Sequence, residues 1–101
     1  MSNGNSQRKT KRWIRANVYR IRLFRIFREE AEKTRDPGER KRLEQKIRHH
    51  QKKIDFLAER GKAMGLTDER IITINREIVE RIIKRERPKT IIRILEEKNL
   101  K

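Results

Sequence analysis

The side chains in this sequence that are best suited to bind a ligand are the Lys and Arg residues near its N-terminus. Residues 1–28 contain nine basic residues and no acidic one, while the 101-residue chain has 30 Lys and Arg against 15 Asp and Glu, a formal charge of +15. Guanidinium groups bind phosphate oxygens through forked donors, and an excess of like charge disfavours a compact fold unless a polyanion offsets it. The charge distribution therefore predicts a phosphate-rich partner, DNA or RNA, bound mainly through its backbone. The expected nucleic-acid contacts are Arg8, Lys9, Lys11, Arg12, Arg15, Arg22 and Arg25.

The segment that carries these basic residues is expected to be helical. No Gly or Pro interrupts residues 9–34, and although residues 18–27 alternate in part like a strand, no other segment alternates to pair with them. At about 100° per residue, the basic stripe lies opposite an apolar face. Ile14, Val18 and Ile21 add a second apolar flank, so we expect this helix to pack against more than one neighbour. The apolar face consists of Trp13, Ala16, Leu23, Phe24, Phe27 and Ala31.

The basic helix has two other interpretations. In the first, its basic side chains are simply exposed to solvent and bind no partner. In the second, it is an amphipathic helix on a membrane surface, where aromatic residues beside Arg are common. Trp13 would stack on an exposed base in a nucleic-acid complex, but we favour a place in the core, because a small core needs its large side chains. Tyr19 lies nearer the basic stripe, and both roles stay open for it.

The sequence offers little for catalysis or metal binding. His49 and His50 are adjacent, so on a helix they point about 100° apart and do not face one ion, and the chain contains no Cys. The Glu residues within 29–32 suit ion pairs with nearby Lys and Arg rather than acid–base catalysis. We therefore expect a non-enzymatic protein without catalytic residue, metal or cofactor. His50 falls on an apolar seam and would make a pH-dependent helix contact if it is buried.

Three more helices are predicted after residue 34, which makes the fold all-α. For the helix over 37–64, Asp36 is the expected N-cap, Pro37 the first helical residue, and Glu39 a carboxylate that reaches back to the cap. Gly65 is expected to end this helix in a left-handed conformation. The helix carries a heptad seam of Leu43, Ile47, His50, Ile54, Leu57, Gly61 and Met64.

The next helix is expected over 67–87, capped by Thr67 and ended by Pro88. Because Gly65 and Leu66 alone join two helices with apolar seams, the sequence predicts an antiparallel helical hairpin over 37–87. The apolar line of the second hairpin helix is Ile71, Ile74, Ile78 and Ile82, with Ile72, Val79 and Ile83 beside it. The expected rigid platform is Leu43, Ile47, Ile54, Leu57, Ile71, Ile78 and Ile82, and a short C-terminal helix within 88–101 is expected to bury Ile91, Ile94 and Leu95.

These segments describe one domain with a flexible N-terminal tail over residues 1–8. The tail lacks the apolar core of a secretory signal, no run of about 18 apolar residues spans a membrane, and the absence of Cys suits a reducing compartment. We therefore expect a cytoplasmic protein. Since a monomer of this composition buries only a modest core, a homodimer or a protein partner docked on the hairpin would cover the remaining apolar surface.

The segment from Lys46 to Arg85 resembles the sporulation stage-zero aspartyl-phosphate phosphatases, above all in G-L-T-D-E-R-I-I-T-I-N-R-E-I-V-E-R-I-I from Gly65 to Ile83. Members of that family are short helical hairpins that remove phosphate from the aspartate of a sporulation response regulator, and they carry a Ser-Gln-Glu-Leu-Asp signature. The corresponding window here is N-R-E-I-V, in which Glu77 is identical and Val79 replaces the closing acid. The resemblance therefore implies a hairpin that interacts with a regulator, without the phosphatase activity.

Overall fold

The fold consists of four helices. The computed structural model describes the backbone of residues 2–100 and the side chains of residues 7–100. Its helices are α1 (Ser2–Lys33), α2 (Pro37–Ala63), α3 (Asp68–Ile83) and α4 (Pro88–Asn99). No strand occurs within residues 2–100, so the all-α prediction is confirmed. Met1 of the predicted tail and Lys101 of the predicted C-terminal segment lie outside the described residues.

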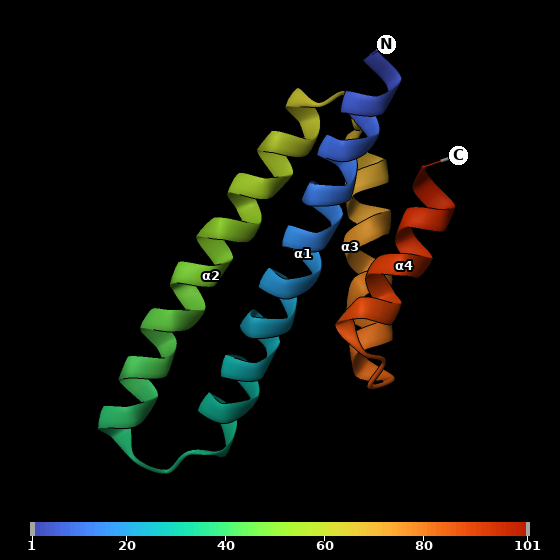
Figure 1. Cartoon of the computed structure of the whole chain (residues 1–101). Helices are drawn as coiled ribbons and strands as arrows, with labels where there is room; N and C mark the ends of the chain where they lie inside the picture. Colours follow the sequence, from blue (N-terminus) through green and yellow to red (C-terminus); the bar gives the residue numbers. More distant parts are fainter. Residues whose placement is uncertain (1, 101) are drawn as a thin grey trace.

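α1 is the central element of the molecule. Figure 1 shows α2 running antiparallel along one side of α1, while α3 and α4 form a second antiparallel pair on another side, near the end that holds both termini. α1 has 32 residues and α3 only 16, so the far end of the α1–α2 pair extends beyond α3 and α4. The molecule is elongated as a result, with extents of 54 × 26 × 20 Å.

α1 begins at Ser2, seven residues before the start expected at Lys9. Residues 2–8, which the sequence predicts as a tail, therefore continue the helix in the structure. The physical reason is that extending an existing helix adds one hydrogen bond for each residue fixed, whereas starting one is costly. No proline in this segment opposes that extension.

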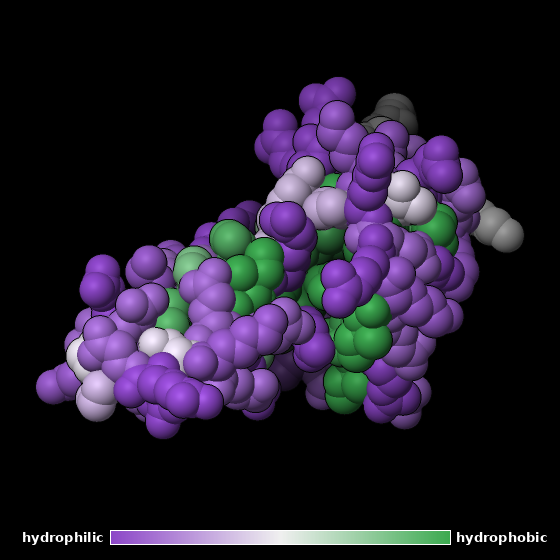
Figure 2. Space-filling view, turned by 90° about the horizontal axis from the view of Figure 1, so that it is seen from below, coloured by the Kyte–Doolittle hydropathy of each residue, from purple (hydrophilic) through white to green (hydrophobic). Residues whose placement is uncertain are grey.

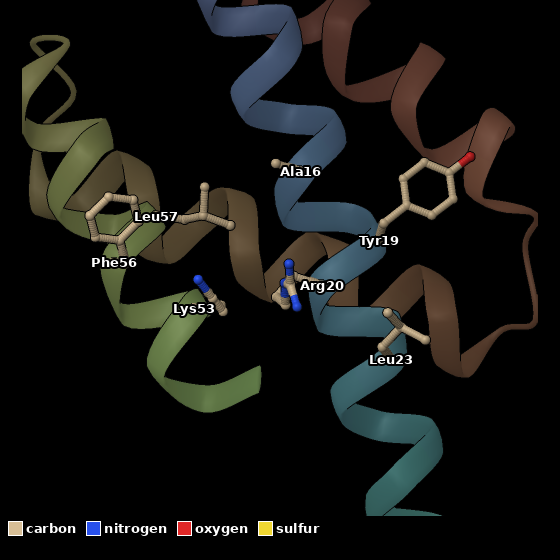
Figure 3. Close-up of a pocket in the computed structure, with 7 residues that line it drawn as sticks. All are labelled: Ala16, Tyr19, Arg20, Leu23, Lys53, Phe56 and Leu57. Atoms are coloured by element: carbon tan, nitrogen blue, oxygen red, sulfur yellow. The ribbon is translucent and has the colours of Figure 1, made fainter. Parts of the chain in front are cut away.

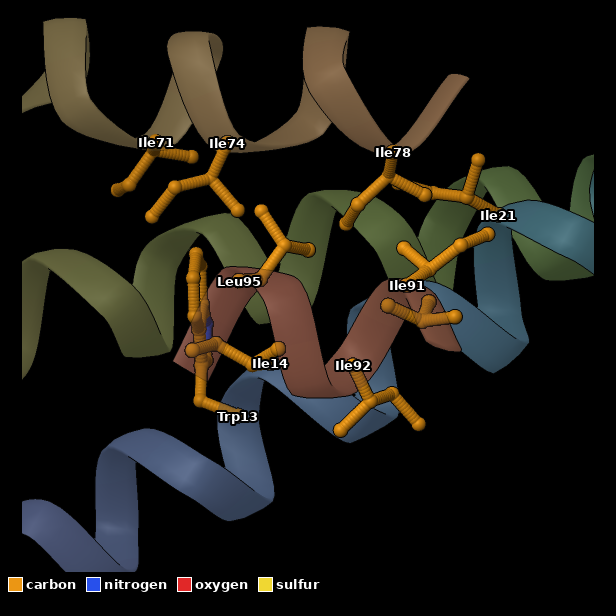
Figure 4. Close-up of a cluster of buried hydrophobic side chains, with 10 residues drawn as sticks. Trp13, Ile14, Ile21, Ile71, Ile74, Ile78, Ile91, Ile92 and Leu95 are labelled. Atoms are coloured by element: carbon orange, nitrogen blue, oxygen red, sulfur yellow. The ribbon is translucent and has the colours of Figure 1, made fainter. Parts of the chain in front are cut away.

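The core lies between α1, α3 and α4. From α1 it takes Trp13 and the flank of Ile14, Val18 and Ile21, so the flank that the sequence placed second supplies most of the α1 contribution. α3 and α4 contribute Ile71, Ile74, Ile78, Ile91, Ile92 and Leu95 (Figure 4). Ile92 is thus buried where the sequence predicted Ile94, which is only half-buried.

The second face of α1 packs on α2 at a close contact around Trp13. The indole is 3% exposed, and its Nε1 donates a hydrogen bond of 2.7 Å to the carbonyl oxygen of Leu57. Gly61 lies directly against the ring, where a Cβ atom would be 2.9 Å from Cζ2 of Trp13. Trp13 therefore holds α1 to α2, which confirms its predicted place in the core.

The predicted pairing of α2 with α3 is not confirmed. The heptad seam of α2 is its buried side, as predicted, but most of that seam packs against α1, and α2 touches α3 in few places. Of the expected platform, Leu43, Ile71 and Ile78 are fully buried, whereas Ile47, Ile54, Leu57 and Ile82 are half-buried. The reason is that α1 offers two apolar faces and so separates the two helices that the sequence places side by side.

The helix ends follow local rules. Asp36 caps α2 by accepting a hydrogen bond from Gly38 N at 3.0 Å, and Thr67 caps α3 by accepting one from Arg70 N at 3.1 Å. The backbone N–H of Asp36 donates to the Thr34 hydroxyl, which takes the place predicted for the Glu39 carboxylate.

The same left-handed turn closes α2 and α3. Gly65 has a φ of 99°, and its N–H and that of the next residue bond back to the last turn of α2, as predicted. Arg85 has a φ of 63° and repeats this arrangement, so α3 ends at Ile83 rather than at residue 87.

Candidate nucleic-acid interface

Six of the seven predicted contact residues are exposed on α1. We call this set the basic ridge; it consists of Arg8, Lys9, Lys11, Arg12, Arg15 and Arg22. The seventh, Arg25, is half-buried, and its Nε atom is buried without a hydrogen-bond partner among the described residues. The helix thus brings six of the predicted residues onto its open side and turns the seventh toward the α3–α4 connection.

No described acidic side chain forms an ion pair with the basic ridge. In the part of the chain whose side chains are described, the ion pairs lie on α2, α3, α4 and the α3–α4 connection: Lys62 with Glu59 and Asp68, Arg81 with Glu77 and Glu86, and Lys98 with Glu77. No ion pair there involves a basic residue of α1. The acidic side chains of these pairs therefore neutralise bases elsewhere and leave the ridge as a concentration of positive charge.

A groove runs beside the ridge, between α1 and α2. Its two adjoining hollows have volumes of about 310 and 580 Å³ and share Ala16 and Leu57 as lining residues. All charged residues that line them are basic. We call this the α1–α2 groove; its basic residues are Lys9, Arg12, Arg20, Lys53 and Arg60, and its exposed rings are Tyr19 and Phe56 (Figure 3).

More bases flank the ridge on its α4 side. A hollow of about 430 Å³ between α1 and α4 is lined by Arg15 and Tyr19 of α1 together with Lys89 and Arg93 of α4, and Glu96 is its acidic member. Tyr19 lines both this hollow and the α1–α2 groove, so its side chain lies between the two. The positive surface therefore extends from α2 across α1 to α4.

The far end of α1 is more mixed in charge. Arg22 and Arg25 line a hollow of about 520 Å³ with residues of the α3–α4 connection, including Arg85 and the acidic Glu86. Apolar side chains also line it, and Figure 2 shows hydrophobic atoms at the surface between the two halves of the molecule on this side. This region, which includes Arg22 of the ridge, is therefore less suited to a polyanion than the rest of the ridge.

His50 joins α2 to α1 through a polar contact. Arg20 donates from a guanidinium nitrogen to Nδ1 of His50 at 2.9 Å, and the imidazole stacks on the Phe27 ring with centroids 5.3 Å apart. Because Arg only donates, Nδ1 must accept, so the imidazole is neutral with its proton on Nε2. Burial lowers the pKa of His50, and nearby Arg20, His49 and Lys46 lower it further.

Glu77, in the window that resembles the phosphatase signature, connects α3 to α4. Glu77 accepts hydrogen bonds from Arg81 at 2.9 Å and from Lys98 of α4 at 2.7 Å. Burial acts to raise the pKa of Glu77, but these two hydrogen bonds outweigh it, so the pKa is lowered. This carboxylate is thus engaged in tying α3 to α4.

Sequence reasoning missed the residues that α2 and α4 add to the basic surface. Lys53, Phe56 and Arg60 lie 30 or more residues from most of the ridge, and only the packing of α2 on α1 brings them to it. The one signal for them was that they lie off the heptad seam of α2, which marks them as exposed without indicating a neighbour.

No group of three His, Asp or Glu side chains within the described residues is arranged to hold a metal ion. No helix in the described part of the chain is both long and apolar enough to cross a membrane. No family model matches the chain, and no curated protein and no solved structure shows significant similarity to it. The case for a function therefore rests on the surface just described.

Proposed function

We propose that this protein binds DNA or RNA without catalysis, chiefly by holding the phosphate backbone with the basic ridge of α1. The observation that carries the proposal is the exposure of six basic side chains on one helix, none of which forms an ion pair among the described residues. Such a protein would serve as an accessory or regulatory factor of a nucleic acid.

The dimensions of the ridge suit this role. Arg8 and Arg22 are fourteen residues apart on a continuous helix, which places them about 21 Å apart along the axis. A duplex presents one phosphate charge for about every 1.7 Å of its length, so the ridge meets many phosphates at once. Guanidinium groups bind them without reading a base, which predicts affinity with little sequence preference.

The test compares two variants of equal net charge. The triple change Arg12→Ala, Arg15→Ala and Arg22→Ala removes exposed ridge residues, and Arg25 is left intact because it is half-buried. The control changes three exposed residues to Ala: Arg70 and Arg76 on α3, and Lys84 directly after it. Binding is measured by fluorescence anisotropy with a labelled duplex DNA and a labelled structured RNA.

We expect the ridge variant to bind about 100-fold more weakly than the native chain, because each lost charged contact contributes on the order of 1 kcal/mol. The control is expected to lose far less. Equal losses would mean that the total charge drives binding and that the ridge is not the site. Tight binding to anionic vesicles, with none to either nucleic acid, would favour the membrane-surface interpretation instead.

A second candidate function is a protein-interaction module, as the resemblance at residues 46–85 implies. The observation that favours it is the exposure of two large apolar side chains on α3, Ile72 at 55% and Ile83 at 60%. A homodimer through this face would cover them. Sedimentation at increasing concentration tests it: a dimer that becomes monomeric in the Ile72→Ser, Ile83→Ser variant supports this candidate, and a monomer at all concentrations rejects the homodimer.

A further inference from the structure

We infer that the α1–α2 groove binds unpaired nucleotides, with Tyr19 and Phe56 as platforms on which bases stack. The inference rests on the proposed function of the ridge and narrows its ligand to single-stranded nucleic acid. The rings themselves are not part of the ridge: they lie in the groove beside it, which shares only Lys9 and Arg12 with the ridge, and one ring belongs to α2.

Tyr19 and Phe56 are exposed to solvent, although the chain has few aromatic residues to supply its core. The chain has five aromatic residues in all, and Trp13 is buried while Phe24 and Phe27 are half-buried. Tyr19 is 40% exposed and Phe56 is 58% exposed, and both line the same hollow. Large rings usually contribute to a core, so the exposure of these two in one groove calls for a ligand with flat, apolar faces.

The placement of the rings suits separate bases better than a single one. Figure 3 shows Tyr19 on α1, with its ring turned away from α2, and Phe56 on α2, with Arg20 and Lys53 between them. Ala16, Leu23 and Leu57 add an apolar lining to this hollow. Two bases of an unpaired strand that crosses from α1 to α2 would each meet one ring.

The charges of the groove match the backbone of such a strand. Arg20 and Lys53 line the hollow that holds the rings, Arg12 and Arg60 line the adjoining hollow, and every charged lining residue of the groove is basic. The Arg60 guanidinium lies 6.0 Å from the centroid of the Phe56 ring. A base stacked at Phe56 therefore has a phosphate-binding cation beside it, which is the combination of aromatic platform and positive groove found where proteins bind single strands.

A duplex fits this groove less well than a single strand. In a duplex the base faces are stacked on one another and only the edges are open, so the rings would gain little from it. The ridge alone would then hold the duplex through phosphates. The native protein should therefore bind an unpaired strand more tightly than a duplex of the same number of phosphates.

The experiment uses the full chain and labelled 12-nucleotide single strands of RNA and of DNA that do not self-pair, with a duplex of equal charge for comparison. The test variants are Tyr19→Leu and Phe56→Leu, which keep apolar bulk but remove the rings. Phe56→Trp is the conservative variant. Ile94→Ala, which shortens a half-buried apolar side chain on α4 outside the groove, is the control.

Each Leu variant is expected to bind the single strands about tenfold more weakly, because stacking on an aromatic side chain contributes roughly 1–3 kcal/mol for each base. Binding of the duplex should change less than twofold, Phe56→Trp should retain affinity, and its tryptophan emission should be quenched by the strand. Native single-strand affinity in both Leu variants would overturn the inference while leaving the ridge proposal intact. Absence of binding to every nucleic acid by the native chain would overturn both. A loss confined to RNA or to DNA would support the inference and identify the strand.

Discussion

Replacing Gly61 by Ala tests how closely α1 and α2 pack. Ala is the better helix former by about 1 kcal/mol, so helix propensity alone predicts a more stable protein. The structure predicts the opposite, because a Cβ atom at this residue would be 2.9 Å from Cζ2 of Trp13 and 3.0 Å from Cδ1 of Ile71. Neither neighbour is the free end of a flexible side chain on the surface, since both residues are buried.

The cost follows from what would have to move. Overpacking a core by one methyl group costs about 1–3 kcal/mol. Displacing the indole would also strain the 2.7 Å hydrogen bond from Trp13 to Leu57, which contributes about 1 kcal/mol. Subtracting the gain in propensity leaves a predicted loss of about 1–3 kcal/mol in the free energy of unfolding, which lowers Tm by roughly 4–8 °C for each kcal/mol in a domain of this size.

The assay is urea unfolding followed by circular dichroism. Gly38→Ala is the matched control, because the nearest atom to its Cβ would be Oδ1 of Asp36 at 3.6 Å, an ordinary contact. In a Trp13→Phe background, where the ring is smaller, Gly61→Ala should be less destabilising. A Gly61→Ala protein that is as stable as the native chain, or more so, would refute the close packing of Trp13 on α2.

Three further predictions concern stability. The pKa of His50 is lowered from its usual 6.5, so the contribution of the neutral imidazole to the free energy of unfolding is fully present above pH 6.5 and is lost as the pH falls through the folded-state pKa. This pH dependence of the free energy of unfolding should be absent in His50→Gln, and an unchanged pH dependence would contradict the assignment. Glu77→Gln should cost about 1 kcal/mol at neutral pH and less as the pH falls below 4.5, the usual pKa of Glu, because the lowered pKa means that the contribution of the carboxylate is lost on acidification. An equal cost at neutral and acidic pH in urea unfolding would count against the pairing with Lys98. Arg85→Gly should raise the free energy of unfolding by about 0.5–1 kcal/mol, because glycine adopts a positive φ without strain; a loss of stability would show that the left-handed turn is not formed.

The helices are largely predictable from sequence because their ends obey local rules. Asp36 and Thr67 cap helices as predicted. The left-handed turn at Gly65 that ends α2 was also predictable, because glycine is the residue that favours a positive φ. The equivalent turn at Arg85 was missed, since an arginine gives no local indication of a positive φ. The end of α3 was therefore placed too late in the chain.

The pairing of the helices is less predictable. Periodicity identified the buried side of α2 and the isoleucine line of α3, but it says which side chains are buried and not which helix covers them. Trp13 and Gly61 together determine the α1–α2 contact, and their fit is a matter of shape that no spacing rule contains. The short connection at Gly65 favoured the α2–α3 pairing instead.

The same limit applies to the candidate site. The basic ridge follows from charge and helical spacing within α1, so its six exposed members were identified from the sequence. The half-burial of Arg25 was missed, because the α3–α4 connection beside it is distant in sequence. Lys53 and Phe56 join the surface only through tertiary packing.

The salt dependence of nucleic-acid affinity tests the central claim most directly. For a duplex, log affinity falls with log salt concentration at about −0.9 for each phosphate contact, so five contacts give a slope near −4.5. Removing Arg12, Arg15 and Arg22 should flatten this slope by about 2.7, while the charge-matched control variant described above keeps it. An identical slope in the native chain and the ridge variant would show that these guanidinium groups do not contact phosphates.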